Sequence, residues 1–263
     1  GQFLKRAHFS CKVTRLSSLL HSFCRESCRN VPLNQMARII FVFLFAFPLF
    51  AWTQSKEEEL AAQYYLNGEF EKAAVLYEKL WKKHPESTYL YKNYLNTLVA
   101  KKDYKEADKL IRAQQKKFPE DMAFVADEPW LLVQQGETEK GKKRALELVE
   151  KVRDDDQALG LALALLQRRF SEAGEAAFLR GRKLANDPFL FAGDLAGLYA
   201  SLGRKKEMVD EGLLHVRVNA QNLEGIQHLF QDHLNGDSDW ELLVKPLMQA
   251  QQKNPNDPVL SEL

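Results

Sequence analysis

The chain has 263 residues, enough for one large domain or an array of repeats. Apolar residues make up 45% and charged residues 28%, a globular balance, and a mean hydropathy of −0.39 excludes a polytopic membrane protein. The formal net charge of +1 is unevenly distributed, because residues 1–51 hold seven Lys or Arg and one acidic residue, which leaves 30 basic and 35 acidic residues after them. An acidic body lacks the basic face that nucleic acids require, so we expect no nucleic-acid partner.

Residues 1–35 are basic, contain no Met and show no sustained helical or strand period. We expect them to be a non-native upstream extension or a disordered leader, with Met36 as the true start. A transit peptide is the alternative, because such segments are rich in Arg and Ser and poor in acids. All three cysteines lie here (Cys11, Cys24, Cys28), without the second ligand pair that a zinc site needs. The rest of the chain therefore has neither disulfides nor a catalytic thiol.

Residues 36–53 have the pattern of a signal peptide. A short basic start ending at Arg38 is followed by 13 mostly apolar residues, 39–51, interrupted by Pro48. About 20 apolar residues are needed to span a bilayer, so this run favours a cleaved signal, with an uncleaved N-terminal anchor as the alternative. Cleavage is expected after Ala51 or Thr53. We therefore predict an exported protein, periplasmic or associated with the outer envelope of a bacterium, without a stable membrane span after cleavage.

From residue 54 onward the chain is self-similar. Three pairs share chemistry at one common offset of about 34 residues: Phe70 and Tyr104, Ala73 and Ala107, Pro85 and Pro119. Internal repeats with such a period predict stacked supersecondary units.

Each unit predicts two antiparallel helices. Leu60, Ala61 and Tyr64 lie on one face of the first helix, and Gly68 stands where the chain must turn, because a left-handed conformation costs glycine nothing. The second helix carries an apolar stripe at spacings of three to four residues: Ala73, Tyr77, Leu80. Pro85 ends it.

These residues resemble the tetratricopeptide repeat, a helix-turn-helix unit of about 34 residues. The first unit departs from the family at Leu80, where Ala is usual, and the second unit has Leu95 and Gln114 in place of small residues. The resemblance is specific over residues 54–121. It implies an all-α fold over residues 54–263, a right-handed superhelical solenoid (α-α superhelix) of about six antiparallel helix pairs.

The later units keep the turn residues and helix boundaries of the first two. Gly136 lies two periods after Gly68, and Pro129 predicts a shortened or kinked first helix in that third unit. Residues 157–185, 188–220 and 222–253 fill the fourth to sixth units. An Asn-Asp-Pro triplet at 186–188 and again at 256–258 predicts two helix starts, with Asp as the cap and Pro in the first turn. The second triplet predicts a seventh unit, and hence a fragment truncated at its C-terminus.

Motifs for catalysis or cofactor binding are missing from the sequence. There is no Gly-rich phosphate loop, no G-x-S-x-G elbow and no H-E-x-x-H pair. The acidic run 154–156 lacks the spacing of a calcium loop. We therefore expect no enzyme, no catalytic residue, no cofactor and no metal.

The resemblance implies that the first helices line the concave side of the solenoid. We predict a partner-binding groove formed by Glu58, Tyr65, Tyr89, Lys92, Asn96 and Trp130. Packing between repeats is an equally good explanation for the aromatic members. In relatives that grip a C-terminal carboxylate, a Lys and an Asn one turn apart form part of a clamp, as Lys92 and Asn96 would. Asp127 is expected to repel such a ligand, which leaves the clamp incomplete.

The predicted function is a protein–protein interaction scaffold that holds a partner peptide or helix in this groove. An accessory protein for envelope assembly or glycan handling is one alternative. The N-terminal repeat region of a longer enzyme is another. The sequence names neither the partner nor the oligomeric state.

Overall fold

The computed structural model describes residues 56–255, 259 and 262–263, and the described part contains helices and turns without a β-strand. The predicted leader (1–35) and signal segment (36–53) lie outside the described residues. The chain divides into two units, Gly1–Glu59 and Leu60–Leu263. The described helices belong to the second unit, except that the first of them begins before its border.

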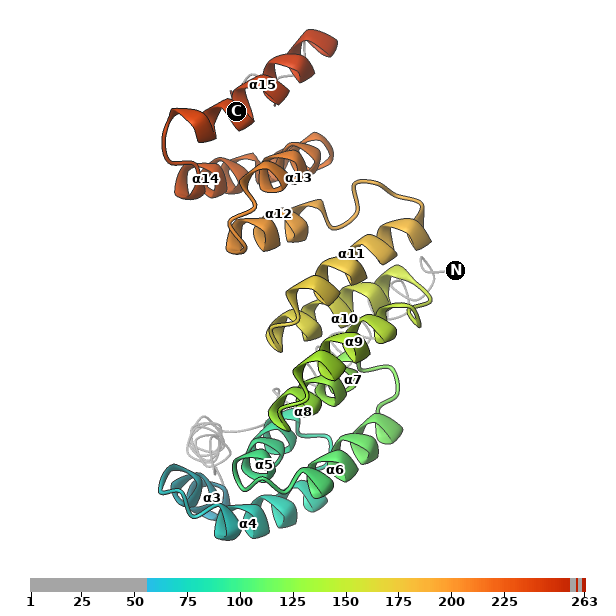
Figure 1. Cartoon of the computed structure of the whole chain (residues 1–263), viewed down its shortest axis with the longest axis vertical. Helices are drawn as coiled ribbons and strands as arrows, with labels where there is room; N and C mark the ends of the chain where they lie inside the picture. Colours follow the sequence, from blue (N-terminus) through green and yellow to red (C-terminus); the bar gives the residue numbers. More distant parts are fainter. Residues whose placement is uncertain (1–55, 256–258, 260–261) are drawn as a thin grey trace, which may run out of the picture. The chain divides into compact units, whose positions relative to one another are not determined.

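The described helices follow one another in pairs (Figure 1). The pairs are α3 (Lys56–Leu66) and α4 (Phe70–Lys83), α5 (Thr88–Ala100) and α6 (Tyr104–Lys117), α7–α8 (Met122–Val125, Asp127–Gln134) and α9 (Thr138–Val149), α10 (Asp155–Gln167) and α11 (Ser171–Ala185), α12 (Ala192–Ser201) and α13 (Lys205–Val218), and α14 (Leu223–His233) and α15 (Asp237–Lys253). Contacts also join each pair to the next, as between α4 and α5, α6 and α8, or α9 and α11. The predicted all-α helical-repeat solenoid is confirmed.

A left-handed backbone residue marks the turn inside each of the first five pairs. These residues are Gly68, Lys102, Gly136, Arg169 and Gly203, with φ between 63° and 86°. Each follows the one before it by one period, so the repeat length continues beyond the first two units. Glycine adopts this conformation without strain, whereas another residue costs about 1–2 kcal/mol. Lys102 and Arg169 are therefore strained turns.

The two helices of a pair cross at a small residue. Ala73 and Ala107 are fully buried there in the first two units. The third and fourth units have Gly141 and Gly174 instead. A Cβ on Gly141 would stand 2.7 Å from Cγ2 of Val133 and 2.8 Å from a backbone oxygen of α8. The third pair therefore packs more closely than an alanine allows.

The third unit confirms the expected effect of Pro129. Its first helix is divided into α7, of four residues, and α8, of eight, with Ala126 between them. Proline has no N–H to donate to the carbonyl of residue 125, so the helix cannot run through this point unbroken. The break places Asp127 at the start of α8.

The predicted helix start at Asn186-Asp187-Pro188 is wrong. Asn186 has φ 52° and ends α11, and the Asp187 carboxylate accepts the N–H of Phe189 at 2.9 Å. Asp187 thus closes a short turn rather than capping a helix. Phe191 also adopts a left-handed conformation, and α12 begins only at Ala192. The second such triplet, 256–258, lies outside the described residues.

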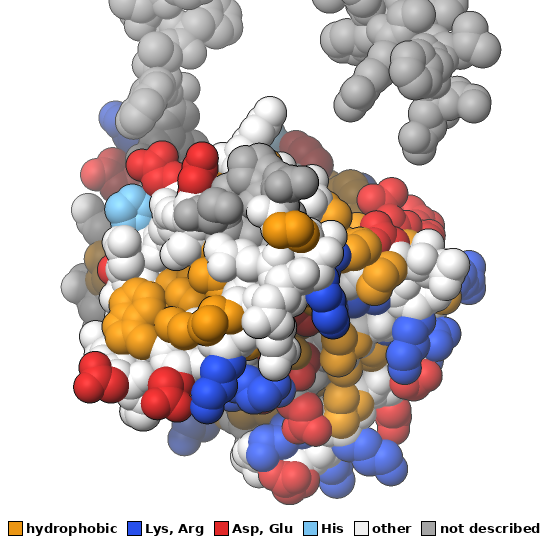
Figure 2. All heavy atoms as spheres, turned by 90° about the horizontal axis from the view of Figure 1, so that it is seen from above, with side chains coloured by type: hydrophobic (Ala, Val, Ile, Leu, Met, Phe, Trp, Pro, Cys, Tyr) orange, Lys and Arg blue, Asp and Glu red, His pale blue; other side chains and the backbone are white. Residues whose placement is uncertain are grey.

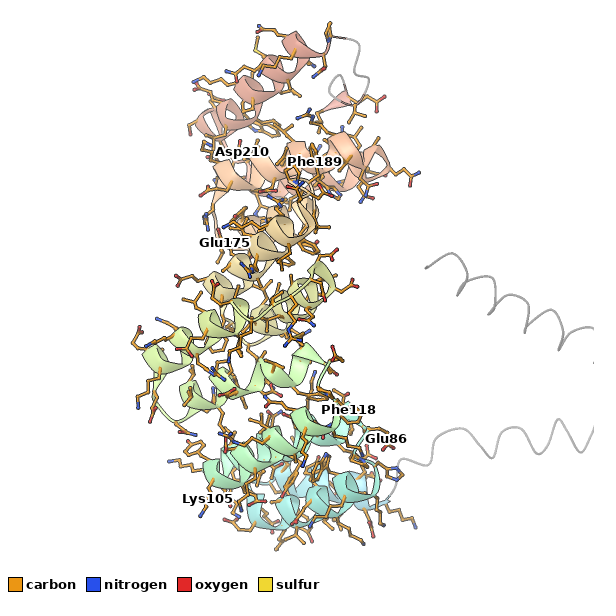
Figure 3. All side chains as sticks on the ribbon, turned by 90° about the vertical axis from the view of Figure 1, so that its right-hand side faces the viewer. Glu86, Lys105, Phe118, Glu175, Phe189 and Asp210 are labelled. Carbon is orange, nitrogen blue, oxygen red and sulfur yellow. The ribbon has the colours of Figure 1, made fainter. Side chains whose placement is uncertain are left out.

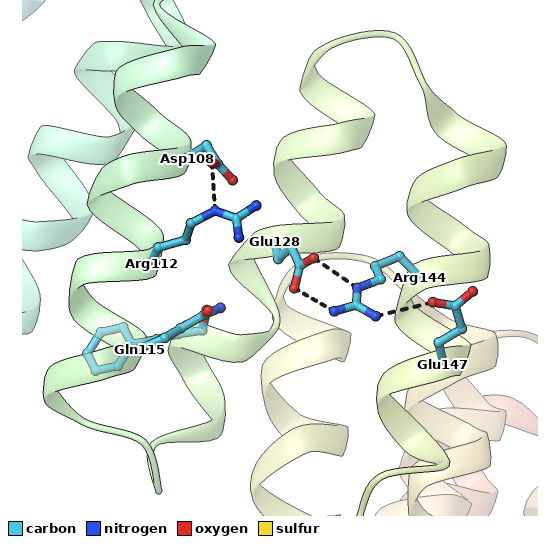
Figure 4. Close-up of polar contacts among 7 residues, drawn as sticks. Asp108, Arg112, Gln115, Glu128, Arg144 and Glu147 are labelled. Carbon is cyan, nitrogen blue, oxygen red and sulfur yellow. Dashed lines mark hydrogen bonds and ion pairs between the residues drawn. The ribbon is translucent and has the colours of Figure 1, made fainter.

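Ion pairs connect neighbouring helices and units. Arg144 on α9 donates to both oxygens of Glu128 on α8, at 2.9 and 3.1 Å (Figure 4). Glu175 on α11, labelled in Figure 3, accepts the Tyr199 hydroxyl at 2.9 Å and an Arg204 N–H at 2.6 Å. The two contacts of Glu175 join the fourth unit to the fifth.

The C-terminal helix α15 exposes an apolar stripe. Its members lie four residues apart and are between 37% and 55% exposed: Trp240, Val244, Met248. Figure 2 views the described chain from the end at which α15 lies and shows apolar side chains gathered there. No described residue covers this stripe completely.

The helix crossing in the third pair generates a stability prediction. We expect Gly141→Ala to lower the free energy of unfolding by about 1–3 kcal/mol, because the added Cβ meets backbone that cannot move aside. Gly197→Ala is the matched control: Gly197 is also helical, but nothing lies within 4 Å of its would-be Cβ. That change should stabilise the fold by about 0.5–1 kcal/mol. Urea unfolding of the two variants measures both, and equal effects would refute the close crossing.

Candidate functional site

A buried carboxylate stands at the centre of the second to fourth units. Asp127 is 2% exposed and accepts hydrogen bonds from the Tyr91 hydroxyl and from Nε of Arg168, both at 2.7 Å. Burial raises the pKa of the Asp127 carboxyl, and the charge of Arg168 opposes that shift. Burial and the neighbouring Asp127 also raise the pKa of Tyr91, so its hydroxyl remains a donor. One carboxylate thus ties α5, α8 and the end of α10 together.

The side chain of Arg168 is held on two sides. Its guanidinium is paired with Asp127 and lies over the Trp130 ring, with Cζ 4.1 Å from the ring centre. A cation over an aromatic face contributes about 0.5–2 kcal/mol, more as water is excluded. Arg168 is therefore fixed in position before any partner arrives.

Lys92 and Asn96 share a small hollow with this arginine. The hollow, of about 120 Å³, is also lined by Ala123, Asp127, Ala164 and Gln167. Lys92 and Asn96 lie one turn apart on α5, and both are exposed. The sequence-based interpretation of Asp127 as a repulsive group is corrected, because its charge is buried and paired with Arg168. The hollow therefore offers two cationic groups and two amides.

Two larger hollows adjoin this one. The first, of about 990 Å³, is lined by residues of the 117–123 segment and by one face of α10. The second, of about 470 Å³, lies between the hairpin turns of the third and fourth units and is lined by Trp130, Val133, Thr138, Leu146 and Phe170 among others. Gln167 lines all three hollows. We call the three together the groove.

The structure brings three of the six predicted groove residues together: Lys92, Asn96 and Trp130. Tyr89 is 51% exposed on the same helix as Lys92, outside the residues that line the three hollows. Tyr65 packs edge-on against Phe70, with ring centroids 5.6 Å apart, so the packing explanation applies to it. Glu58 is half-buried on the part of α3 that belongs to the first unit.

Sequence reasoning missed the residues at the turn end of the groove. Gln167 and Arg168 directly precede the left-handed Arg169, and the sequence analysis placed them in the fourth unit without singling them out. Thr138 also lines the groove. The signal that could have found them is Thr138, because the first two units have an aromatic residue at this position, two residues after the turn.

The described residues show two further features. None of their helices is long and apolar enough to cross a membrane. Across the same residues, no three His, Cys, Asp or Glu side chains stand close enough to hold a metal ion.

The buried ion pair generates a second prediction. Asp127→Asn leaves Arg168 without its charge partner, and we expect the free energy of unfolding to fall by about 3–5 kcal/mol. Tyr91→Phe removes one hydrogen bond to a charged group and should cost about 1.5–3 kcal/mol. Urea unfolding of both single variants and the double variant gives their coupling. Additive losses would mean that Tyr91 and Asp127 do not act as one network.

Comparisons with known proteins agree with this architecture. The tetratricopeptide repeat family matches residues 64–127. No curated protein matches the chain.

Solved structures of similar fold include a thermophilic TPR protein of Thermus thermophilus, 18% identical, covering 67% of this chain and 96% of that one with a TM-score of 0.35. PilF of Pseudomonas aeruginosa is 18% identical over 78% of this chain and 93% of its own, with a TM-score of 0.30. PilW, a type IV pilus biogenesis factor, is 15% identical over 78% and 96%, with a TM-score of 0.29. Residues 64–127 therefore match the tetratricopeptide repeat family, and the helix pairs continue beyond them with the same period.

Proposed function

We propose that the protein is an interaction scaffold that binds a peptide or helix of a partner protein in the groove. The observation that supports this most is the convergence of polar side chains from three successive units on adjoining hollows. Arg168 is held rigidly by Asp127 and Trp130, so little side-chain entropy is lost when it contacts a ligand.

The groove also offers donors that are free of hydrogen-bond partners. Among the described residues, neither Lys92 nor Asn96 makes a side-chain hydrogen bond. Apolar surface lies in the adjoining hollow of about 990 Å³, where Leu163 on α10 is 45% exposed. Free donors next to exposed apolar surface suit a peptide, which supplies both carbonyl groups and side chains. We propose that binding, rather than catalysis, is the role of this surface.

The proposal is tested by placing a photoreactive benzophenone amino acid at Leu163 and cross-linking to envelope extract. We expect a discrete partner, and at least a tenfold loss of its adduct in a Lys92→Glu/Asn96→Ala variant, since each lost hydrogen bond to a charged or polar group contributes about 1 kcal/mol or more.

Lys116→Glu is the matched control, with the same charge change at an exposed lysine of α6 that lines none of the three hollows. A second control places the same probe at Val75, which is 66% exposed on α4. If Val75 gives the same adduct, or if the groove variant leaves capture unchanged, the groove is not the binding site.

We further propose that the protein works outside the cytoplasm, on the basis of the signal pattern at residues 36–53. The mature chain should then begin at Trp52 or Gln54. Mass spectrometry of the N-terminal peptide from native protein decides this, and an intact peptide that includes residues 39–51 would contradict cleavage.

A further inference from the structure

An aromatic residue seals the junction between the second and third units. Tyr104 stands two residues after the left-handed Lys102, as Phe70 does after Gly68. The Tyr104 ring is half-buried, and its hydroxyl donates to the carbonyl oxygen of Gln134 at 3.0 Å. The ring therefore lies between the turn of one unit and the end of the next first helix.

The following junction lacks such a ring. Thr138 stands two residues after Gly136, as Tyr104 does after Lys102, and Gln167 stands two residues before Arg169, as Gln134 does before Gly136. Thr138 and Gln167 line the hollow of about 470 Å³. Protein interiors are packed densely, so a missing ring leaves room of this kind unless other side chains fill it. The hollow thus occupies the place that a tyrosine fills one unit earlier.

We propose that this hollow receives an aromatic side chain of the partner, with an acidic residue next to it. This inference rests on the proposed function and names the anchor that the groove selects. The walls are apolar and aromatic, from Trp130, Val133, Leu146 and Phe170. Arg168, Arg169 and Lys142 line the same hollow with one acid, Glu172. Arg168 is paired with Asp127 and Lys142 with Glu139, so Arg169 is the cation of the three that is left for an incoming carboxylate.

Arg169 supports the acidic neighbour by a separate observation. It has φ 65°, whereas the same turn position is glycine in the first, third and fifth units. Its side chain makes no hydrogen bond or ion pair with any described residue. A cation in a strained backbone conformation beside an apolar hollow is an arrangement typical of ligand sites.

The opposite end of the groove has the opposite charge. The hollow of about 990 Å³ is lined by Glu120, Asp121, Asp154 and Asp156 but only one cation, Lys117. The partner segment is therefore extended and dipolar, with its aromatic–acidic end between the third and fourth units and basic residues at the 117–121 end.

The test measures binding of a fluorescein-labelled synthetic peptide, Lys-Lys-Gly-Ser-Gly-Ser-Tyr-Glu-Glu, and of its reversed sequence, by fluorescence anisotropy with the full 263-residue chain. One of the two should bind, and replacing its Tyr by Ala should weaken binding at least tenfold. Thr138→Tyr refills the hollow as Tyr104 does, and should weaken binding at least tenfold while raising Tm.

Arg169→Gly and Lys102→Gly form a matched pair. Both relieve a left-handed non-glycine residue, so both should raise Tm by about 2–4 °C. Only Arg169 lines the hollow, so Arg169→Gly should weaken binding about three- to tenfold and Lys102→Gly should not change it.

The outcomes separate this inference from the proposed function. If the folded Thr138→Tyr variant binds either peptide as the wild type does, the anchor is wrong, whereas loss of binding in Lys92→Glu/Asn96→Ala would still support the groove. If both of these variants bind unchanged, or if neither peptide binds, the dipolar segment is refuted. If 3-(4-hydroxyphenyl)propionate binds as tightly as the peptide, the hollow is a small-molecule site and the peptide proposal fails.

Discussion

A single helix pair cannot bury its apolar face alone, so every unit depends on the turn that aligns its two helices into one face for the next unit. That turn needs a backbone residue with positive φ, and the first five pairs supply one at nearly constant spacing. The reversal sets the register between the two helices, so a small residue such as Ala73 or Gly141 meets the partner helix at the crossing. The pairs then stack because contact with the next pair buries their remaining apolar stripe.

The polar centre of the groove follows from one irregularity in that pattern. Pro129 breaks the first helix of the third unit, and α8 starts at Asp127, whose side chain turns inward to Tyr91 and Arg168. A buried ion pair contributes little net stability over an apolar replacement. What it provides is position: Arg168 is fixed toward Lys92 and Asn96, although its charge is shared with Asp127.

Periodicity made most of the fold predictable. Gly68, Pro85 and their counterparts at one offset were enough to place the helix pairs, because a repeat imposes the same backbone solution on each unit. The Asn186-Asp187-Pro188 triplet led to a wrong helix start, because Asp closes short turns as readily as it caps helices. The left-handed conformation of Phe191 delays the start of α12 to Ala192. The site was predictable where it lies on a helix face, as for Lys92 and Asn96. It was not predictable at Gln167 and Arg168, because their roles depend on contacts with residues far away in the sequence, such as Asp127.

Two departures from the repeat lie together, although Lys102 also replaces the turn glycine in the second unit. Pro129 divides a helix, Thr138 replaces an aromatic residue and Arg169 replaces a glycine, and the latter two line one hollow next to the buried pair. Each departure alone weakens local packing or strains the backbone. Stability would favour repairing them, as the neighbouring units show with Tyr104 and Gly136. Local rules in proteins are broken mainly where binding requires it. We therefore propose that the junction of the third and fourth units is the part of the solenoid adapted to a ligand rather than to its own stability.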